Sequence, residues 1–209
     1  MEEKRQLIIE RTFDLFYRYG IKSVSMDDIA RELGMSKKTL YQHVKDKGEL
    51  VDEVIDYMRS FMEEFISVFY DDSLNAIEQH KVYWQKLDSK FVNCKPNFLF
   101  DLRKYYPSVL QNINEWKRKA IYESNFANLE QGKREGLYRA DLNSHIISKL
   151  LVGYQIFIFD PANELFSEVD IAEAQTFEQV YSYHFFGICT PKGMDEVQRL
   201  FCDTNKDNH

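Results

Sequence analysis

The sequence has few of the residues that break regular structure, with eight glycines and four prolines in 209 residues. Proteins built from many short strands need frequent turns, so this scarcity favours an all-α chain with long helices. Cysteine is also rare: Cys94, Cys189 and Cys202 are far apart and form no C-x-x-C pair. They indicate reduced thiols, and they exclude a disulfide framework or a cysteine-based zinc site.

Long apolar segments are absent as well. No stretch approaches the roughly 18 uncharged apolar residues of a membrane span. The N-terminus, MEEKRQLIIERTF, lacks the apolar run of a signal peptide. We therefore expect a cytoplasmic protein. Hydrophobic residues make up 44% of the chain, which is enough for a packed core and excludes a disordered protein.

Basic residues are in the minority, with 27 Lys and Arg against 34 Asp and Glu and a net charge of −7. This balance excludes a protein that coats nucleic acid through its phosphates. The charge is uneven, however. Residues 1–50 carry ten basic and nine acidic side chains, whereas the 17 basic side chains of residues 51–209 face 25 acidic ones. From Lys37 to Lys47 there are four basic residues and one acidic residue.

Patterns of common catalytic sites are missing too. The histidines form neither H-E-x-x-H nor H-x-x-x-H, and there is no G-x-S-x-G segment and no P-loop. We therefore expect no enzyme, no cofactor and no metal. An all-helical enzyme is kept as an alternative that turnover of a candidate ligand would revive.

Apolar residues at helical spacing are present along the whole chain and predict helices almost throughout. The expected helices lie near residues 3–19, 25–33, 37–44, 47–70, 74–93, 97–105, 107–133, 142–159, 170–187 and 191–203. Local signals support several starts: Ser25 with Asp28 forms a capping-box pattern, as does Asp170 with Glu173. Thr190 precedes Pro191, which suits the first position of a helix.

Residues 25–47 form the most informative segment. Two short helices joined by about three residues that include Gly34 predict a helix-turn-helix. Their apolar positions are expected to pack on the first helix, namely Ile29, Leu33, Leu40 and Val44. Lys37 and Lys38 would then be exposed in a first helical turn, where the helix dipole disfavours cations and an external anion would reverse the penalty. A basic turn is most often plain solvated surface, but here it coincides with a helix-turn-helix.

This segment resembles the TetR family of transcriptional regulators. The resemblance covers about residues 5–52 and rests on five features: Gly20 after the first helix, Ser25 before Asp-Ile-Ala, the turn Ala-x-x-x-Gly-x-Ser, the segment Thr-Leu-Tyr-x-His at 39–43, and Lys47 before the fourth helix. Val44, where the family often has Phe, and Gly48 in the first turn of the fourth helix depart from the pattern.

The resemblance implies a DNA-binding surface made of Ser25, Ser36, Lys37, Lys38, Thr39, Tyr41, Gln42, His43 and Lys47. Ser25 and Lys47 are expected to hold phosphates, and Tyr41 and His43 to contact the backbone or groove edge. The bases would be read by Lys37, Lys38, Thr39 and Gln42. Family members are similar in forming homodimers on near-palindromic double-stranded DNA, with recognition helices about 34–36 Å apart.

The remainder is expected to be a larger helical domain for effector binding and dimerisation. The predicted division is residues 1–47 for the helix-turn-helix domain, 48–204 for the larger domain and 205–209 for a disordered tail. Candidate pocket residues are Phe61, Phe65, Trp84, Phe98, Tyr105, Trp116, Tyr122, Phe126, Tyr154 and Phe157, although for any single one ordinary core is the more common role. Candidate dimer contacts, open to the same alternative, are Ile146, Lys149, Gly153, Ile156, Phe177, Tyr181, His184 and Phe185.

The sequence thus predicts a ligand-responsive DNA-binding regulator, a repressor that a small-molecule effector releases from its operator. The acidic surface favours a neutral or cationic effector over an anionic one. Two alternatives remain: a transcriptional activator, and a ligand-binding or interaction module whose helix-turn-helix is vestigial.

Overall fold

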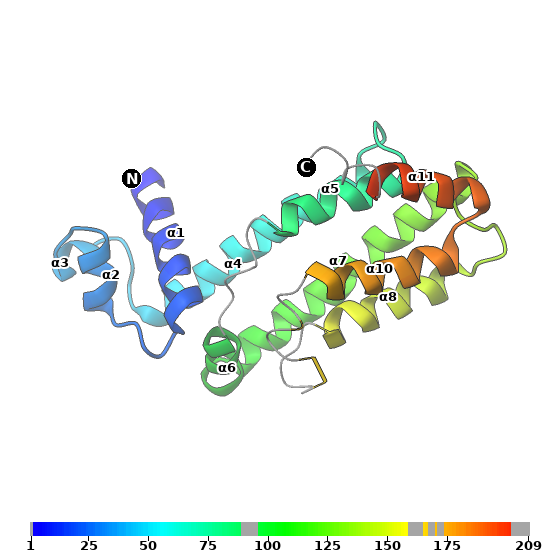
Figure 1. Cartoon of the computed structure of the whole chain (residues 1–209). Helices are drawn as coiled ribbons and strands as arrows, with labels where there is room; N and C mark the ends of the chain where they lie inside the picture. The colour runs from blue at the N-terminus through cyan, green and yellow to red at the C-terminus, as the bar shows by residue number, and fades with distance from the viewer. Residues whose placement is uncertain (1, 89–95, 159–164, 167–169, 171–173, 202–209) are drawn as a thin grey trace, which may run out of the picture. The chain divides into compact units, whose positions relative to one another are not determined.

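The computed structural model describes residues 2–88, 96–158, 165–166, 170 and 174–201. Most of these residues lie in helices (Figure 1), and an isolated antiparallel bridge joins Tyr138 to Cys189. The predicted all-α class is confirmed. None of the helices in these ranges is both long enough and apolar enough to cross a membrane.

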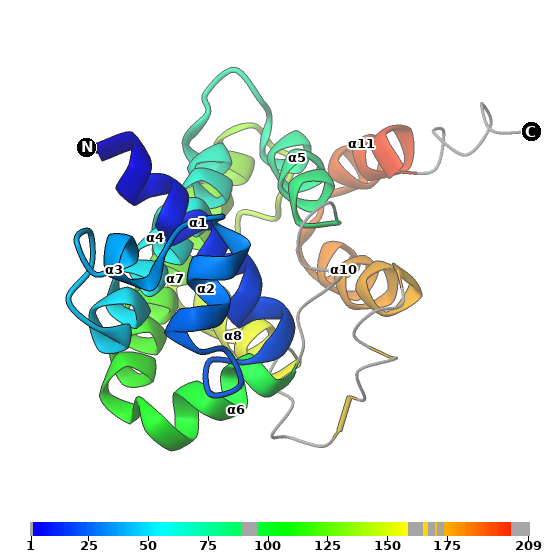
Figure 2. The ribbon, with the colours of Figure 1, turned by 90° about the vertical axis from the view of Figure 1, so that its left-hand side faces the viewer.

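The first of two compact units comprises residues 1–63 and 93–116. It contains α1 (Glu2–Tyr19), α2 (Met26–Glu32), α3 (Lys37–Leu40), most of α4 (Lys47–Ile66), α6 (Pro96–Tyr105) and the start of α7 (Pro107–Arg134). Figure 2 shows α1, α2 and α3 from the side on which the short helices lie. This unit does not end at the predicted boundary at residue 47, because it takes in α6. The functional division at residue 47 remains a prediction.

The second unit comprises residues 64–92 and 117–209. It contains the 3-10 helix η1 (Ser67–Tyr70), α5 (Ala76–Asp88), most of α7, α8 (Ser144–Ile158), α10 (Ala174–Ile188) and α11 (Pro191–Phe201). The predicted helices match these elements, with two differences. The segment expected to be helical to Val44 ends as α3 at Leu40, and the long helix expected to reach residue 70 ends at Ile66 and continues as η1. The predicted tail, 205–209, lies outside the described residues.

The core of the second unit is apolar with a polar network inside it. Its buried residues are Ala76, Ile77, Leu129, Leu137, Tyr138, Phe185, Ile188, Cys189 and Leu200. Buried amide groups pair with one another: the Gln79 amide donates to Gln131 at 2.8 Å, and the Asn128 amide donates to Gln79 at 2.8 Å. Because each of these buried polar side chains has a partner, the network fixes how α5 packs on α7.

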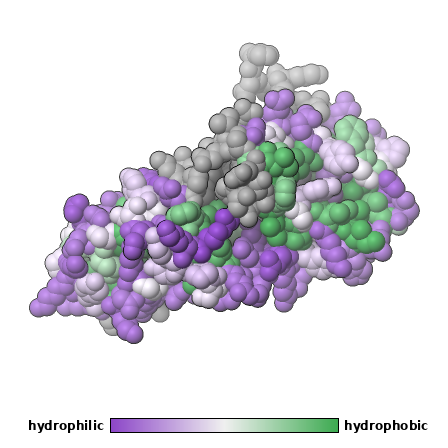
Figure 3. All heavy atoms as spheres, turned by 90° about the horizontal axis from the view of Figure 1, so that it is seen from below, coloured by the Kyte–Doolittle hydropathy of each residue, from purple (hydrophilic) through white to green (hydrophobic). Residues whose placement is uncertain are grey.

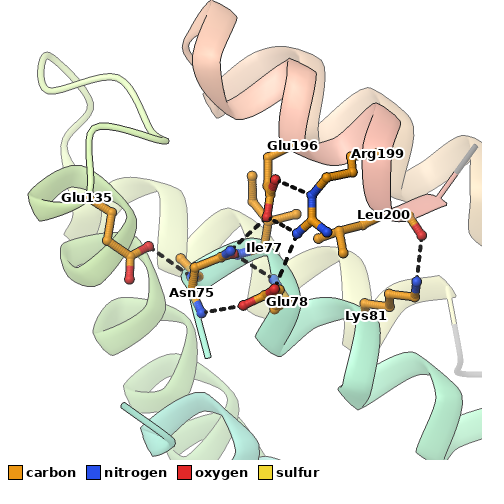
Figure 4. A network of polar contacts seen from close by, with 9 residues as sticks. Asn75, Ile77, Glu78, Lys81, Glu135, Glu196, Arg199 and Leu200 are labelled. Carbon is orange, nitrogen blue, oxygen red and sulfur yellow. Dashed lines mark hydrogen bonds and ion pairs between the residues drawn. The ribbon is translucent and has the colours of Figure 1, made fainter. Parts of the chain in front are cut away.

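The helix α11 is held on α5 by a polar cluster at its surface (Figure 4). Arg199 donates to Glu196 at 2.6 Å and to Glu78 at 3.3 Å, and the Asn75 amide donates to Glu196 at 2.8 Å. The Arg199 guanidinium, followed by the Asn75 amide, holds the pKa of Glu196 at about 2, well below its usual range. Figure 4 shows these side chains converging from both helices, so α11 is fixed on α5 by directional contacts as well as by its apolar face.

The start of α11 lies so close to the chain before α8 that a side chain does not fit at Gly193. A Cβ built there would meet the carbonyl oxygen of Leu137 at 2.1 Å, and backbone atoms have little room to move. We expect Gly193→Ala to lower the free energy of unfolding by about 1–3 kcal/mol through overpacking. Urea denaturation would measure this. Gly153→Ala on α8, where a Cβ meets nothing within 4 Å, is the matched control and should be as stable as the wild type or more so.

Candidate DNA-binding interface

The helix α2 begins as its sequence predicts. The Ser25 hydroxyl accepts from the Asp28 backbone N–H at 3.2 Å, and the Asp28 carboxylate accepts from the Ser25 backbone N–H at 2.9 Å. These two hydrogen bonds complete the capping box, and the Ser25 hydroxyl lowers the pKa of Asp28. Ser25 is exposed at this end of the helix. Its hydroxyl is already engaged with Asp28, so it reaches a phosphate only by sharing or exchanging that bond.

The turn between α2 and α3 depends on Gly34. Its φ of 62° lies in the left-handed region, which glycine adopts without steric cost. The Met35 N–H then donates to Ala30 at 2.9 Å, and the chain enters α3 at Ser36. The Ser36 hydroxyl caps α3 by accepting from the Thr39 N–H at 3.1 Å. The predicted helix-turn-helix geometry is therefore present.

Two buried side chains fix the recognition segment: Leu40 is fully buried and Val44 is 2% exposed. The remaining residues of the predicted surface are brought to the outside of the first unit. Exposed are Ser25, Ser36, Lys37, Lys38, Tyr41 and Gln42, and partly exposed are Thr39, His43 and Lys47. After α3 the chain continues as a hydrogen-bonded turn, with the Gln42 N–H donating to Thr39 and the His43 N–H to Leu40. None of the nine residues is needed inside the core.

The two lysines at the start of α3 differ. Lys37 donates to the Asp27 carboxylate of α2 at 2.8 Å, and this contact raises the pKa of Lys37. Lys38 is exposed and has no hydrogen bond or ion pair within the described residues. Asp27 was not among the predicted site residues, because its neighbour Asp28 accounts for the capping pattern and a partner ten residues away is invisible to local rules.

Lys47, expected to hold a phosphate, points partly inward. Its ammonium group donates to the Val24 carbonyl and lies 5.7 Å from the centre of the Phe16 ring. Burial, followed by the charge of Lys22, lowers its pKa. Lys47 thus joins the start of α4 to the loop before α2, and its contact with DNA remains a prediction.

The ends of the recognition segment are anchored to α1. Arg5 donates to the backbone carbonyl of His43 at 2.8 Å and forms ion pairs with Glu49 and Glu53 of α4. These contacts raise the pKa of Arg5 and, together with the Lys45 backbone N–H, lower that of Glu49. His43, in the turn that follows α3, is therefore fixed by a side chain 38 positions earlier in the sequence.

A second anchor comes from α6. The Asp101 carboxylate, 6% exposed, accepts from the Lys22 backbone N–H at 2.6 Å. The chain approaches so closely because residue 20 is a glycine with φ of 85°, where a Cβ would lie 2.9 Å from Asp101. Sequence reasoning missed Asp101, since the contact spans 79 residues. The loop that leads into α2 is thus fixed by α6.

The ten aromatic residues of the predicted effector pocket are divided between the two units. Phe98 is buried in the first unit against Tyr17, with ring centres 5.9 Å apart, and Tyr105 is 43% exposed beside Lys22. Phe61 and Trp116 also belong to the first unit, whereas Phe65, Trp84, Tyr122, Phe126, Tyr154 and Phe157 belong to the second. Phe157 is exposed. The pocket formed by these aromatics therefore stays a prediction.

A small cavity does lie between α8 and α10, and Tyr154 from the predicted set lines it. Its other lining residues are Leu151, Gln155, Ile158, Thr176, Val180, Tyr181 and His184. The cavity holds about 20 Å³, room for roughly one water molecule. A larger molecule would enter only if α8 and α10 moved apart.

Two buried histidines meet beside this cavity. The rings of His80 and His184 are 6.3 Å apart, and burial lowers the pKa of His80 to about 3 and that of His184 to about 4. Asn128 contacts Nε2 of His80 at 3.0 Å, whereas Nδ1 of His80 and Nε2 of His184 have no hydrogen-bond partner within the described residues. Both imidazoles are therefore neutral at pH 7.

The predicted dimer contacts divide into two groups. Ile146, Lys149 and Gly153 of α8 are exposed and Ile156 is half-exposed. Tyr181, His184 and Phe185 are 6%, 9% and 2% exposed, because they pack inside their own unit around Trp84 and His80. These three side chains are buried within the single chain, and their role as dimer contacts stays a prediction. The side chain of Phe177 lies outside the described residues.

Other large apolar side chains are exposed on the same two helices. On α8, Ile146, Leu150, Tyr154 and Phe157 are between 42% and 56% exposed and recur every three or four residues. On α10, Tyr183 and Phe186 are 75% and 72% exposed. Figure 3 shows apolar side chains at the surface of the second unit among polar ones. We call these six residues the α8/α10 apolar face. Exposed apolar surface of this extent is typical of interaction sites.

Known proteins are similar to this chain at two levels: one family matches the helix-turn-helix segment, and individual relatives match most of the chain. The family described as bacterial regulatory proteins, tetR family, matches residues 8–54, which include every residue of the predicted DNA surface. The HTH-type transcriptional regulator YvaF of Bacillus subtilis strain 168 is 26% identical over 191 residues, covering 90% of this chain and 97% of that protein.

Solved structures share the fold over most of the chain. A transcriptional regulator from Cytophaga hutchinsonii is 20% identical, with a TM-score of 0.68 over 90% of this chain and 99% of its own. The TetR family protein CprB from Streptomyces coelicolor, solved in complex with its operator sequence, is 16% identical, with a TM-score of 0.66 over 99% of this chain and 98% of its own.

Proposed function

We propose that the chain, whose helix-turn-helix segment matches the tetR family of bacterial regulators, is a homodimeric repressor that a small-molecule effector releases from a near-palindromic operator. The observation that carries this proposal is the exposed surface around α3. Donors suited to phosphates and base edges gather there, while the apolar residues of the same segment are buried.

The α8/α10 apolar face supports the homodimer. Its six large side chains would be buried by a second copy of the same face, as in a four-helix interface with two-fold symmetry. Two reading heads related by two-fold symmetry require an operator with matching symmetry. The operator is therefore expected to be near-palindromic.

The effector response is supported by the cavity between α8 and α10. Its lining carries no formally charged side chain, because His184 is neutral. His184 lines the cavity, and its Nε2, which has no hydrogen-bond partner in the described part of the chain, would hydrogen-bond a guest. An uncharged effector fits this chemistry better than an anion. The change that the effector causes in DNA affinity would equal the difference between its own affinities for the DNA-bound and the released conformation.

Selection from a random pool of double-stranded DNA tests the proposal. We expect enrichment of a near-palindromic duplex, with affinity that falls as salt rises. If the protein enriched no sequence but bound a small molecule tightly, the chain would be a ligand-binding module with a vestigial helix-turn-helix. Repression or activation would be separated by a reporter carrying the selected duplex at different positions relative to the promoter.

Gln42 is exposed on the recognition segment and is predicted to read a base. We expect Gln42→Ala to weaken binding to the selected duplex by about 1–3 kcal/mol and to relax the preference at one base pair in each half-site. Repeating the selection with the variant would measure both effects.

The matched control is Gln111→Ala, which removes an exposed amide from α7. It should leave affinity and preference unchanged. If Gln42→Ala weakened the selected duplex and a scrambled duplex equally, Gln42 would contact the DNA backbone and the assignment to base reading would be wrong.

A further inference from the structure

Asp27 is a carboxylate in the first turn of α2, at the predicted DNA-reading surface, that takes no part in the capping box. The capping box of α2 uses Ser25 and Asp28, so the helix start is complete without Asp27. Asp27 is 58% exposed and its partner Lys37 49% exposed, and a surface ion pair of this kind contributes little to stability. Its position beside the predicted DNA contacts gives it another consequence.

The contact removes a positive charge from the surface that meets DNA. The Lys37 ammonium lies 2.8 Å from the Asp27 carboxylate, so the two charges cancel locally. To contact a phosphate, Lys37 must exchange one anion for another, and Asp27 is then left unpaired near the polyanion. Lys38, next in sequence and without an ion-pair partner in the described part of the chain, meets no such competition.

The exchange affects different DNA sequences differently. Unrelated DNA offers Lys37 only phosphates, and binding to them depends on net charge. A matching groove also offers acceptors on base edges, such as guanine O6 and N7, held in a fixed geometry that rewards a positioned lysine. Competition from Asp27 therefore weakens binding to unrelated DNA more than binding to the operator.

We propose that Asp27 is a specificity-determining residue: by holding Lys37 in an internal ion pair, it withholds this charge from the phosphates of unrelated DNA. This inference extends the proposed DNA-reading function and rests on it. The ion pair links α2 to α3, the two helices that are expected to approach the DNA. The raised pKa of Lys37 keeps the lysine charged throughout the physiological range.

The test measures binding of Asp27→Asn to two duplexes of equal length, the one selected by the wild-type protein and a scrambled version. We expect the variant to bind the scrambled duplex about 3- to 10-fold more tightly, with a salt slope steeper by about one. Affinity for the selected duplex should change less than about twofold, so the ratio of the two affinities falls.

Three further variants test whether the change in affinity comes from the ion pair. The double variant with Lys37→Gln and Asp27→Asn should not show the increased affinity for the scrambled duplex. Lys37→Gln alone should change the affinity for that duplex less than about twofold. Asp14→Asn, which neutralises an exposed carboxylate of α1, should show no gain. Circular dichroism would confirm that each protein is folded.

Several outcomes would overturn the inference. A gain that persists without Lys37, or an equal gain in Asp14→Asn, would assign the effect to overall charge. Loss of affinity for the selected duplex alone would mean that Asp27 orients Lys37 for base reading. If the wild-type protein selected no sequence, the repressor proposal would fail, yet the scrambled-duplex comparison would still decide whether Asp27 neutralises Lys37.

Discussion

Leu150→Asp is expected to convert the proposed dimer into monomers and to lower affinity for the selected duplex by at least about 1,000-fold. Leu150 is 49% exposed in the middle of the α8 stripe, so the change leaves the core of the monomer intact. In a dimer the same carboxylate would be buried against apolar side chains without a partner, which is strongly unfavourable. A monomer holds one half-site and loses the effective concentration that the second reading head provides.

Analytical ultracentrifugation would measure the association state, and DNA titration the affinity. Arg118→Asp, at an exposed polar position of α7, supplies the matched control and should remain dimeric with wild-type affinity. A Leu150→Asp protein that stayed dimeric would show that the α8/α10 apolar face is not the contact between copies. A monomeric protein with undiminished affinity would instead refute the two-headed mode of DNA binding.

The second large effect expected is loss of stability in mild acid, caused by His80 and His184. Their pKa values are about 3 and about 4 in the folded protein, whereas an unfolded histidine has its usual value of about 6.5. Between these limits the unfolded chain binds more protons, so stability is present in full above pH 6.5 and falls as the pH drops. The two groups together remove roughly 4 kcal/mol between pH 6.5 and 4.5.

Urea denaturation across this pH range would measure the effect. His184→Gln should flatten the pH dependence by up to about 1.4 kcal/mol per pH unit, even if it lowers stability at pH 7. His145→Gln is the control, because His145 is exposed and should leave the slope unchanged. A slope that is the same in all three proteins would show that His184 does not cause the acid sensitivity.

The DNA-reading surface was predictable because it is local. The capping pattern of Ser25 and Asp28, the left-handed Gly34 and the cap at Ser36 each act within a few residues, and each is found in the structure. The end of α3 was less predictable. Apolar spacing continues to Val44, but the backbone beyond Leu40 tightens into a turn that keeps Val44 buried.

The second unit shows why the pocket and dimer contacts were harder to predict. The apolar residues of α10 lie on several sides of the helix, so their spacing does not reveal which of them face the core. Tyr181 and Phe185 are buried, while Tyr183 and Phe186 are exposed. That choice depends on α5, whose Trp84 lies 3.9 Å from the Tyr181 ring. Contacts between distant segments decide which side of a helix is buried, and these contacts cannot be predicted from the local pattern of a single sequence.

The bond between Asp101 and the Lys22 backbone has a consequence for building chimeric regulators. Moving residues 1–47 onto another effector domain would leave α6 behind, and with it the carboxylate that holds the loop before α2. Phe98, which is 1% exposed beside Tyr17, would be lost from the same place. A transplantable DNA-reading module from this protein must therefore be assembled from two separate pieces of chain, and a graft that keeps α6 should retain operator recognition better than one cut at residue 47.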